Sequence, residues 1–178
     1  MELVRPIVTT RLILRGLSRE AGFGRYAQWM ADQDVIRYLE ARLRPSGPDD
    51  LAAYIERMNG SEDNLFLGIF LGGTDQHIGN IKLGPINGHH RRAHVGVMIG
   101  AKEHWGKGLA AEAIDALCRH AFGELGLHRV DAGCNEFNES SKKAFAKAGF
   151  TEEAVMRDYW LCEGEWHDQV MMARIAAP

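Results

Sequence analysis

The sequence predicts a single mixed α/β domain with a mostly antiparallel sheet. Three apolar, β-rich stretches, over 65–71, 78–83 and 93–100, follow one another with short connections between them. Such connections are too short for crossover helices, so neighbouring strands should run antiparallel. Beyond them, an amphipathic helix, a strand and a second helix alternate between residues 107 and 148. A strand that follows a helix can lie parallel to the strand that precedes that helix, which gives a mixed sheet flanked by helices.

Length and composition are those of one soluble globular domain. The chain has 178 residues, 46% hydrophobic and 25% charged, with a formal net charge of −3. That charge provides no basic field for nucleic acid or for an anionic membrane. No apolar run approaches the roughly 20 residues that span a bilayer, and the first residues lack the features of a signal peptide. We therefore expect a cytoplasmic protein that binds neither nucleic acid nor membrane.

Cysteine and histidine usage indicates a reduced, metal-free protein. The three cysteines, Cys118, Cys134 and Cys162, are odd in number and form no CxxC motif. They are expected to be free thiols. The eight histidines show no metal-ligand spacing, so no metal site is expected.

The first third of the chain predicts one strand and two helices. A β-branched run over 9–17 reads as a strand, and 20–30 and 49–58 have helical periodicity. The stretch 35–39 is ambiguous, and Pro45–Pro48 breaks the chain before the second helix. Four residues of the first helix are expected to share its apolar face: Phe23, Tyr26, Ala27 and Met30.

The remaining elements have local stop and start signals. Gly72–Asp75 reads as a hairpin turn after the strand 65–71, and 85–92 reads as a polar loop. Asn138 is a plausible N-cap for a helix that Gly149 ends. The last residues, 152–175, predict two strands that turn at Glu163–Gly164.

Two glycines, Gly106 and Gly108, stand where the strand 93–100 gives way to the helix 107–122. Glycine adopts backbone conformations that other residues resist, and a helix N-terminus presents free N–H groups and a positive dipole end. Together they predict a receptor for phosphate groups. The same residues spell GxGxxA, with Asp131 about 20 residues on, as in dinucleotide-binding domains. The antiparallel meander before the glycines, and the distance of the glycines from the preceding strand, argue against a dinucleotide-binding domain.

Three sequence blocks give the chain a resemblance to the GNAT superfamily of acyl-CoA-dependent N-acetyltransferases. They are Thr10–Arg15, Trp105–Ala110 and the segment from Asn135 to Ser141, which leads to Lys147–Phe150. The most similar subgroup is that of the ribosomal-protein N-terminal alanine acetyltransferases. Trp105 departs from the Arg or Gln that usually opens the family's CoA loop, although Trp-Gly-Lys-Gly is common in this subgroup.

The resemblance implies an enzyme that uses acetyl-CoA as co-substrate and an amine as acceptor, working as a monomer or homodimer. It implies that the strands 93–100 and 129–134 start as neighbours and splay apart, with pantetheine between them. The pyrophosphate would lie on the glycine turn, and the backbone N–H of Met98 is a candidate oxyanion donor. The residues expected to bind CoA are Val97, Met98, Ile99, Trp105, Gly106, Lys107, Gly108, Leu109, Ala110, Asn138 and Ser141.

Three residues are candidates for catalysis, each with a simpler structural explanation. Ser141 would donate to the departing sulfur, or it merely lies in the first turn of its helix. His94 stands where the subgroup often carries a glutamate proposed as base, and strand alternation turns it away from Val95. It would relay the proton of the amine, or it is a surface residue beside the loop 89–92, which is the favoured explanation. Glu40 would bind or deprotonate the amine, or it is a solvated charge. The aromatic pair Tyr159 and Trp160 would wall the acceptor site or pack in the core.

The sequence leaves the acceptor open. Neutralising a lysine amine at pH 7 costs about 4.6 kcal/mol but an α-amine only about 1 kcal/mol, so an α-amine needs little help from a base. A protein N-terminus, an amino-sugar nucleotide of surface polysaccharide synthesis, an antibiotic and a polyamine are all candidates. The net charge of −3 slightly favours a cationic acceptor through steering. A non-catalytic acyl-CoA-binding domain is the alternative of another class.

Overall fold

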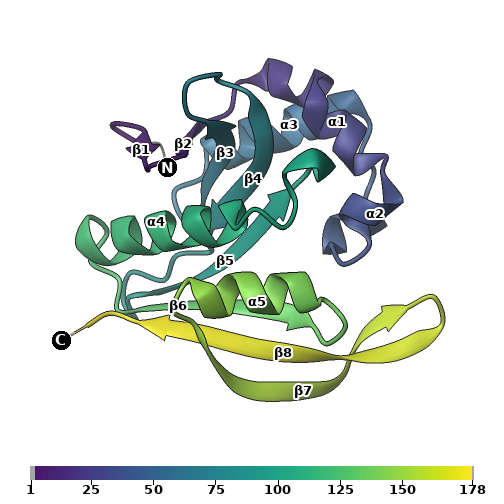
Figure 1. The fold of residues 1–178 in the computed structure, drawn as a ribbon, viewed down its shortest axis with the longest axis vertical. Coiled ribbons are helices and arrows are strands. Elements are labelled where there is room, and N and C mark those ends of the chain that lie inside the picture. Colours follow the sequence, from purple (N-terminus) through teal and green to yellow (C-terminus); the bar gives the residue numbers. More distant parts are fainter. Residues whose placement is uncertain (1–2, 178) are drawn as a thin grey trace.

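A computed structural model describes residues 3–177 as one α/β unit built on an eight-stranded sheet (Figure 1). The strand order is β1-β2-β3-β4-β5-β6-β8-β7. The strands are β1 (Ile7–Val8), β2 (Leu12–Gly16), β3 (Leu65–Leu71), β4 (His77–Leu83), β5 (Arg92–Ile99), β6 (Arg129–Asn135), β7 (Thr151–Cys162) and β8 (Glu165–Ile175). The α-helices are α1 (Arg25–Met30), α2 (Gln33–Ile36), α3 (Pro48–Asn59), α4 (Leu109–Gly123) and α5 (Glu139–Lys147). Short 3₁₀ helices are η1 (Arg19–Phe23), η2 (Glu40–Leu43) and η3 (Lys102–His104).

The predicted antiparallel meander is confirmed. β2 pairs with β3, β3 with β4 and β4 with β5, all antiparallel. The C-terminal hairpin turns where expected, because Glu163 and Gly164 both have positive φ, of 53° and 88°, as a tight two-residue turn requires. β6 then pairs with β8 rather than with β7, which leaves β7 at the edge of the sheet.

The expected helix over 20–30 is wrong in part. Gly24, with φ −99° and ψ −137°, separates the 3₁₀ helix η1 from α1. Phe23 is therefore 52% exposed instead of lying in the core, whereas Tyr26 and Met30 are buried as expected. The ambiguous stretch around Val35 begins as the short helix α2, which Asp32 caps through the N–H of Asp34.

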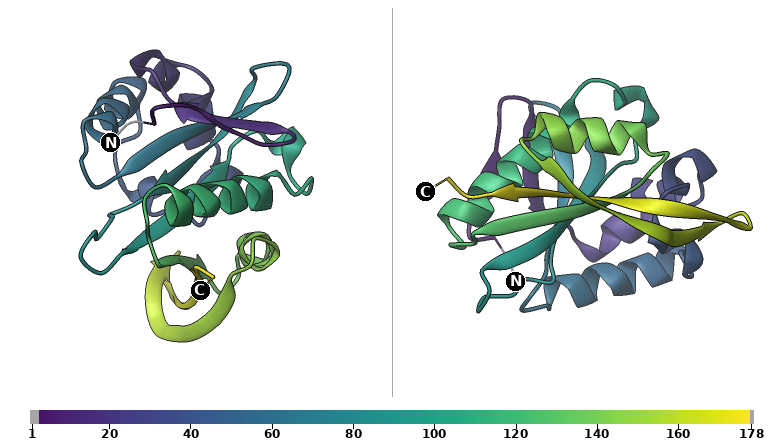
Figure 2. Two further views of the ribbon diagram at one scale, coloured as in Figure 1. Left: turned by 90° about the vertical axis from the view of Figure 1, so that its left-hand side faces the viewer. Right: turned by 90° about the horizontal axis from the view of Figure 1, so that it is seen from below.

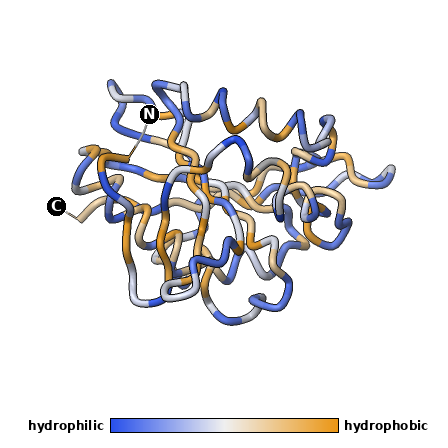
Figure 3. The backbone as a smooth tube through the Cα atoms, turned by 90° about the horizontal axis from the view of Figure 1, so that it is seen from above, coloured by the Kyte–Doolittle hydropathy of each residue, from blue (hydrophilic) through white to orange (hydrophobic). Residues whose placement is uncertain are grey.

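Helices cover the sheet on both sides. α1 and α3 pack on one side, and α4 and α5 on the other (Figure 2). The hydrophobic stretches run through the interior of the fold, and hydrophilic ones lie mostly in the outer loops (Figure 3). Within residues 3–177, no helix is both long enough and apolar enough to span a bilayer.

The parallel pair β5–β6 separates early, as predicted. Its ladder joins Arg92 to Arg129, Ala93 to Val130 and His94 to Asp131, and the register extends no further within the described residues. β5 nevertheless continues to Ile99 and β6 to Asn135. Two strands that start as neighbours and then diverge leave backbone groups of β5 without a strand partner.

Strand alternation defines two faces of the sheet at this divergence. The α4 face carries Val95, Val97 and Ile99 of β5 and Cys134 of β6, since the Cys134 thiol contacts α5. The α1 face carries the intervening residues. It is identified by Gly100, where a side chain would run into Trp29 of α1. Its members on β4, β5 and β6 are Asn80, Lys82, His94, Gly96, Met98, Asp131, Gly133 and Asn135.

Candidate functional site

The turn before α4 is built around two glycines with left-handed backbone. Gly106 has φ 73° and Gly108 has φ 74°, a conformation that disfavours side chains. A Cβ added to Gly106 would meet nothing within 4 Å, so the space over the turn is open. α4 begins at Leu109 rather than at Lys107 as predicted, because Gly108 is its N-cap. The N–H groups of the first turn, including those of Leu109 and Ala110, have no partner within the helix.

Cationic side chains from three parts of the chain border this turn. Lys147, at the end of α5, places its Nζ 3.3 Å from the position that a Cβ on Gly108 would take. A guanidinium nitrogen of Arg11 lies 3.9 Å from the same position. Lys107 lies within the turn and is exposed. Free N–H groups, a helix dipole and three cations make the turn suitable for a diphosphate.

Hydrogen bonds fix the turn against the rest of the fold. The Trp105 indole Nε1 donates to the carbonyl of Ile99 at 2.7 Å, which ties the turn to the end of β5. Arg11 donates to the carbonyl of Lys107 at 2.9 Å and to Glu112 of α4 at 2.6 Å. Thr9 also donates to Glu112, at 2.6 Å. The role of Arg11 is not visible in the sequence, because Arg11 and Lys107 lie 96 residues apart.

The divergence of β5 and β6 leaves specific backbone groups of β5 open. The N–H of Gly84 donates to the carbonyl of His94, and that of Gly100 to the carbonyl of Ile78. Even-numbered residues of β5 therefore direct their backbone groups toward β4, and odd-numbered ones toward β6. Met98, which pairs with Asn80, therefore directs its N–H toward β4, so the prediction that it is the oxyanion donor is wrong. The N–H groups of Val97 and Ile99 point toward the divergence instead.

The first turn of α5 lies beside the divergence. Asn138 is the N-cap, as predicted, and its side-chain oxygen accepts from the N–H of Ser141 at 3.1 Å. The Cys134 thiol contacts the Ser141 hydroxyl at 3.5 Å, with sulfur as the donor. That contact uses a lone pair of Ser141 and leaves its O–H free to donate to another group.

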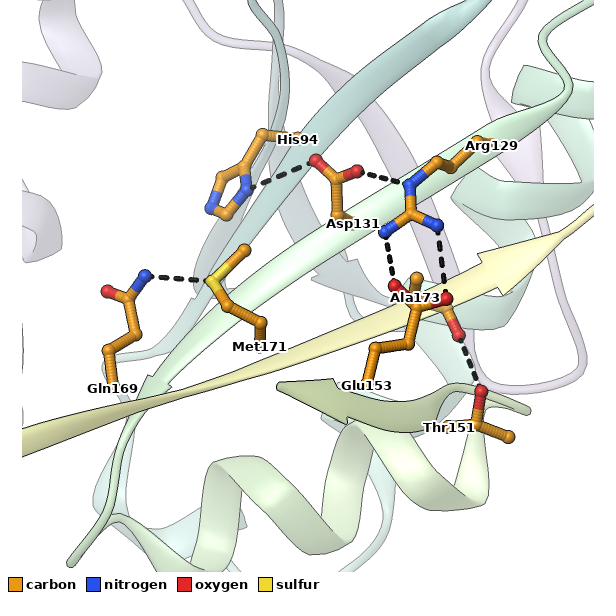
Figure 4. Close-up of polar contacts among 8 residues, drawn as sticks. All are labelled: His94, Arg129, Asp131, Thr151, Glu153, Gln169, Met171 and Ala173. Carbon is orange, nitrogen blue, oxygen red and sulfur yellow. Dashed lines mark hydrogen bonds and ion pairs between the residues drawn. The ribbon is translucent and has the colours of Figure 1, made fainter. Parts of the chain in front are cut away.

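His94 lies on the α1 face within a charged network (Figure 4). Its Nδ1 is 3.9 Å from the Asp131 carboxylate, which Arg129 also contacts at 2.8 Å. Arg129 forms a second, two-pronged contact with Glu153. The proximity of His94 and the hydrogen bond from Arg129 lower the pKa of Asp131 against the effect of burial. Asp131 thus stays ionised beside the imidazole of His94, whose Nε2 has no hydrogen-bond partner among the described residues.

The remaining predicted residues lie near the far end of the C-terminal hairpin. Arg42, in η2 with Glu40, donates to the Cys162 thiol at 3.3 Å, so η2 lies against this hairpin. Glu40 itself is exposed. Tyr159 is 47% exposed, whereas the Trp160 Nε1 is buried without a hydrogen-bond partner among the described residues.

Side-chain contacts that the sequence did not predict also lie at this end. The Asn135 side chain accepts from the N–H of Phe137 at 3.0 Å, which fixes the orientation of its amide. It donates to His167 Nδ1 at 3.1 Å. Their sequence separation of 32 residues gives no local signal, and only the pairing of β6 with β8 brings them together.

Comparison with known proteins gives a consistent result. The acetyltransferase (GNAT) domain family matches residues 11–151. A probable N-acetyltransferase of Bacillus subtilis strain 168, YjcK, is 36% identical over 69% of this chain and 67% of its own. The ribosomal protein uS5 alanine N-acetyltransferase of Escherichia coli K12 is 29% identical over 94% and 89%. A spermidine N-acetyltransferase from Vibrio cholerae, crystallised with CoA and spermine, superposes with a TM-score of 0.82 at 22% identity over 94% and 96%.

Proposed function

Because this chain belongs to the GNAT family and is an N-acetyltransferase, we propose that it moves the acetyl group of acetyl-CoA directly to a primary amine. The observation that carries this proposal is the glycine turn at the start of α4, placed beyond two strands that diverge. Such a turn receives a diphosphate, and an open strand edge receives the amide groups of a pantetheine arm. Both partners would be bound together, so transfer needs no acetylated enzyme.

The residues fit the CoA portion of the co-substrate. Leu109 and Ala110 would offer N–H groups to the diphosphate, and Arg11, Lys107 and Lys147 would balance its charge. Val97 would offer its backbone C=O to an amide N–H of the pantetheine. Because Trp105 bonds to the carbonyl of Ile99, the turn and the open strand edge keep a fixed relative position.

The chemistry divides among side chains and backbone of this chain. Acetyl-CoA supplies an activated thioester whose C–S bond breaks as the amine forms its C–N bond. The N–H of Val97 or Ile99 would stabilise the oxyanion, which is worth about 2.7–4 kcal/mol for one such donor. Ser141 would donate its O–H to the departing sulfur, and His94, oriented by Asp131, would take the proton of the amine.

An α-amine is the favoured acceptor within this proposal. The protein-acetylating relative acts on an alanine N-terminus by its name. Neutralising an α-amine near pKa 7.8 costs about 1 kcal/mol at pH 7, so this acceptor needs only weak general-base help, such as that of the half-exposed His94. A protein N-terminus or a small molecule with an α-amine is therefore proposed.

Substitution of the glycine turn tests the proposal. Gly106→Val should raise the KM for acetyl-CoA about tenfold or more, because the side chain would strain the left-handed backbone and fill the open space over the turn. Gly88→Val is the control, since Gly88 also faces open space but has no positive φ. Release of free CoA thiol is followed with a panel of amines, and folding by circular dichroism. A folded Gly106→Val enzyme with unchanged KM would contradict the assignment.

A further inference from the structure

A buried carboxamide lies at the point where β5 and β6 separate. Gln169 of β8 is only 6% exposed, and it shares the α1 face with Asn135, its partner on β6. A Cβ added to Gly133 would meet the Cδ, Nε2 and Oε1 atoms of Gln169 at 2.8, 2.9 and 3.0 Å. The carboxamide therefore lies across Gly133. This glycine stands two residues beyond Asp131, the last residue of β6 that pairs with β5.

Two sulfur atoms determine which way this carboxamide faces. The Nε2 of Gln169 donates to the Sδ of Met171 at 2.9 Å and lies 3.8 Å from the Sδ of Met156. A thioether sulfur accepts hydrogen bonds weakly and has no hydrogen to donate, so the nitrogen faces the sulfurs and Oε1 faces away from them. Within residues 3–177, Oε1 accepts no hydrogen bond, and it is not one of the fully buried polar atoms without a partner. Solvent can therefore reach it.

The α1 face around the carboxamide is open and carries flexible apolar side chains. An added Cβ on the exposed Gly96, on the β5 side of the divergence, would meet nothing within 4 Å. Three methionines share this part of the face, and none of them is fully buried: Met98 of β5, Met156 of β7 and Met171 of β8. Methionine adapts its shape to irregular apolar groups, so these side chains suit an apolar ligand.

The proposed base lies on the same face. Figure 4 shows the Gln169 carboxamide directed at the Met171 sulfur, with His94 reaching the same face from β5. Asp131 lies beside His94 and Gly133 lies beneath Gln169, and these two residues of β6 are roughly 7 Å apart along the strand. An amine between them would have a neutral oxygen acceptor on one side and an imidazole on the other.

We propose that Gln169 and the three methionines form the acceptor subsite. The Gln169 Oε1 accepts a hydrogen bond from the amine, and the methionines contact an apolar side chain on the carbon next to that amine. This inference rests on the proposed acetyl transfer and narrows its acceptor to an α-amine with an apolar side chain. A polyamine is disfavoured, because Gln169 is uncharged and the carboxylate beside His94, that of Asp131, already bonds to Arg129.

Four amines test this chemistry in the wild-type enzyme. L-Leucinamide and L-asparaginamide have side chains of similar shape and different polarity, glycinamide has no side chain, and spermidine is a polyamine. The kcat/KM for leucinamide should exceed that for each of the others roughly tenfold or more, because a side chain of this size gains about that factor when it leaves water. Release of CoA thiol gives the rates, and mass spectrometry identifies the products.

Variants of Met171 test the apolar contact. Met171→Ala should bring the ratio of kcat/KM for leucinamide to that for glycinamide toward one, whereas Met171→Leu should keep it. The ratio is taken within each enzyme, so a general loss of activity does not mimic the effect. Met58→Ala is the control, because Met58 is also partly buried but lies on α3, which packs against β3. It should keep the wild-type ratio.

A variant of Gln169 tests the polar contact. Gln169→Met keeps the size of the side chain and removes the oxygen acceptor. It should raise the KM for leucinamide about tenfold and leave the KM for acetyl-CoA unchanged. A carboxamide that served packing alone would not produce this selective change, since loss of packing would alter both constants or the thermal stability. Thermal unfolding of each variant is measured alongside.

The outcomes separate this inference from the function beneath it. Equal use of the three amides, a preference for spermidine, a ratio that survives in Met171→Ala, or an unchanged amine KM in Gln169→Met would overturn the subsite while leaving acetyl transfer intact. Wild-type enzyme that releases no CoA with any amine would instead contradict the proposed function. A ratio that falls in Met171→Ala and stays in Met58→Ala, together with a selective rise of the amine KM in Gln169→Met, supports the inference.

Discussion

Ser141 shows how neighbouring contacts leave a small side chain available for the role proposed for it. Its backbone N–H is used by the Asn138 cap, and its hydroxyl oxygen faces the thiol of Cys134. Burial raises the pKa of Cys134, so that thiol remains a donor at neutral pH. The Ser141 O–H is then free to donate toward the divergence of the strands, where a thiolate would leave.

Replacing Ser141 by alanine should lower kcat roughly tenfold while the KM for acetyl-CoA stays near its original value, because the lost hydrogen bond forms mainly as the sulfur departs. Steady-state rates with saturating amine measure both constants. Ser140→Ala is the matched control, since Ser140 lies in the same turn and its hydroxyl bonds to Asn138 instead. Equal kcat for Ser141→Ala and wild type would remove Ser141 from the chemistry.

At the scale of elements, α4 is held to the N-terminal strands through its first turn. Glu112 accepts hydrogen bonds from the Thr9 hydroxyl and from both the backbone and the guanidinium of Arg11. Burial raises the pKa of Glu112, but these hydrogen bonds outweigh it and the net pKa is lowered. The same Arg11 holds the carbonyl of Lys107, so the anchor of the helix is also the anchor of the glycine turn.

Glu112→Gln should destabilise the fold by about 1–2 kcal/mol at pH 7, because charge-assisted hydrogen bonds are lost. The loss is no larger because Arg11 is half-exposed and solvent screens its charge. Because the folded state lowers the pKa of Glu112, ionisation stabilises it above the unfolded pKa, near 4.3. The difference between variant and wild type should therefore shrink as pH falls through 4. Urea unfolding at several pH values measures it, with Glu62→Gln as control. A constant difference across this range would refute the ionic anchor.

Across the whole molecule, buried histidine couples stability to pH. His77 stacks on Phe70 and contacts Trp29 inside the layer between the sheet and α1. Burial lowers its pKa, although the hydrogen bond with Asn80, 2.8 Å long, acts in the opposite direction. Burial lowers the pKa of His120 as well. The folded protein thus binds fewer protons than the unfolded chain in weakly acidic solution.

Stability should accordingly decline as pH falls below about 6.5, where unfolded histidine takes up protons, with a slope of up to about 1.4 kcal/mol per pH unit for each residue. His77→Gln should remove part of that slope, and the remaining part should come from His120. Denaturant unfolding between pH 7.5 and 5 provides the measurement, and His89→Gln, in an exposed loop, should keep the wild-type slope. A variant with the full slope would exclude His77 as its source.

Local sequence predicted most elements because their signals are short-range. Alternating apolar residues, the turn at Glu163–Gly164 and the Asn138 cap each act within a few positions, and the structure contains all three. Where local signals conflict, prediction failed: Gly24 breaks the helix expected over 20–30, and Gly108 delays the start of α4.

The sequence by itself determined most of the strands and helices in their order, the glycine turn and the family, since each rests on neighbouring residues. Only the tertiary structure decided which β5 amides face the divergence and that Arg11 anchors the turn. The reason is physical: strand phase and long-range pairing depend on how distant segments pack, and Arg11 and Lys107, for example, lie 96 residues apart.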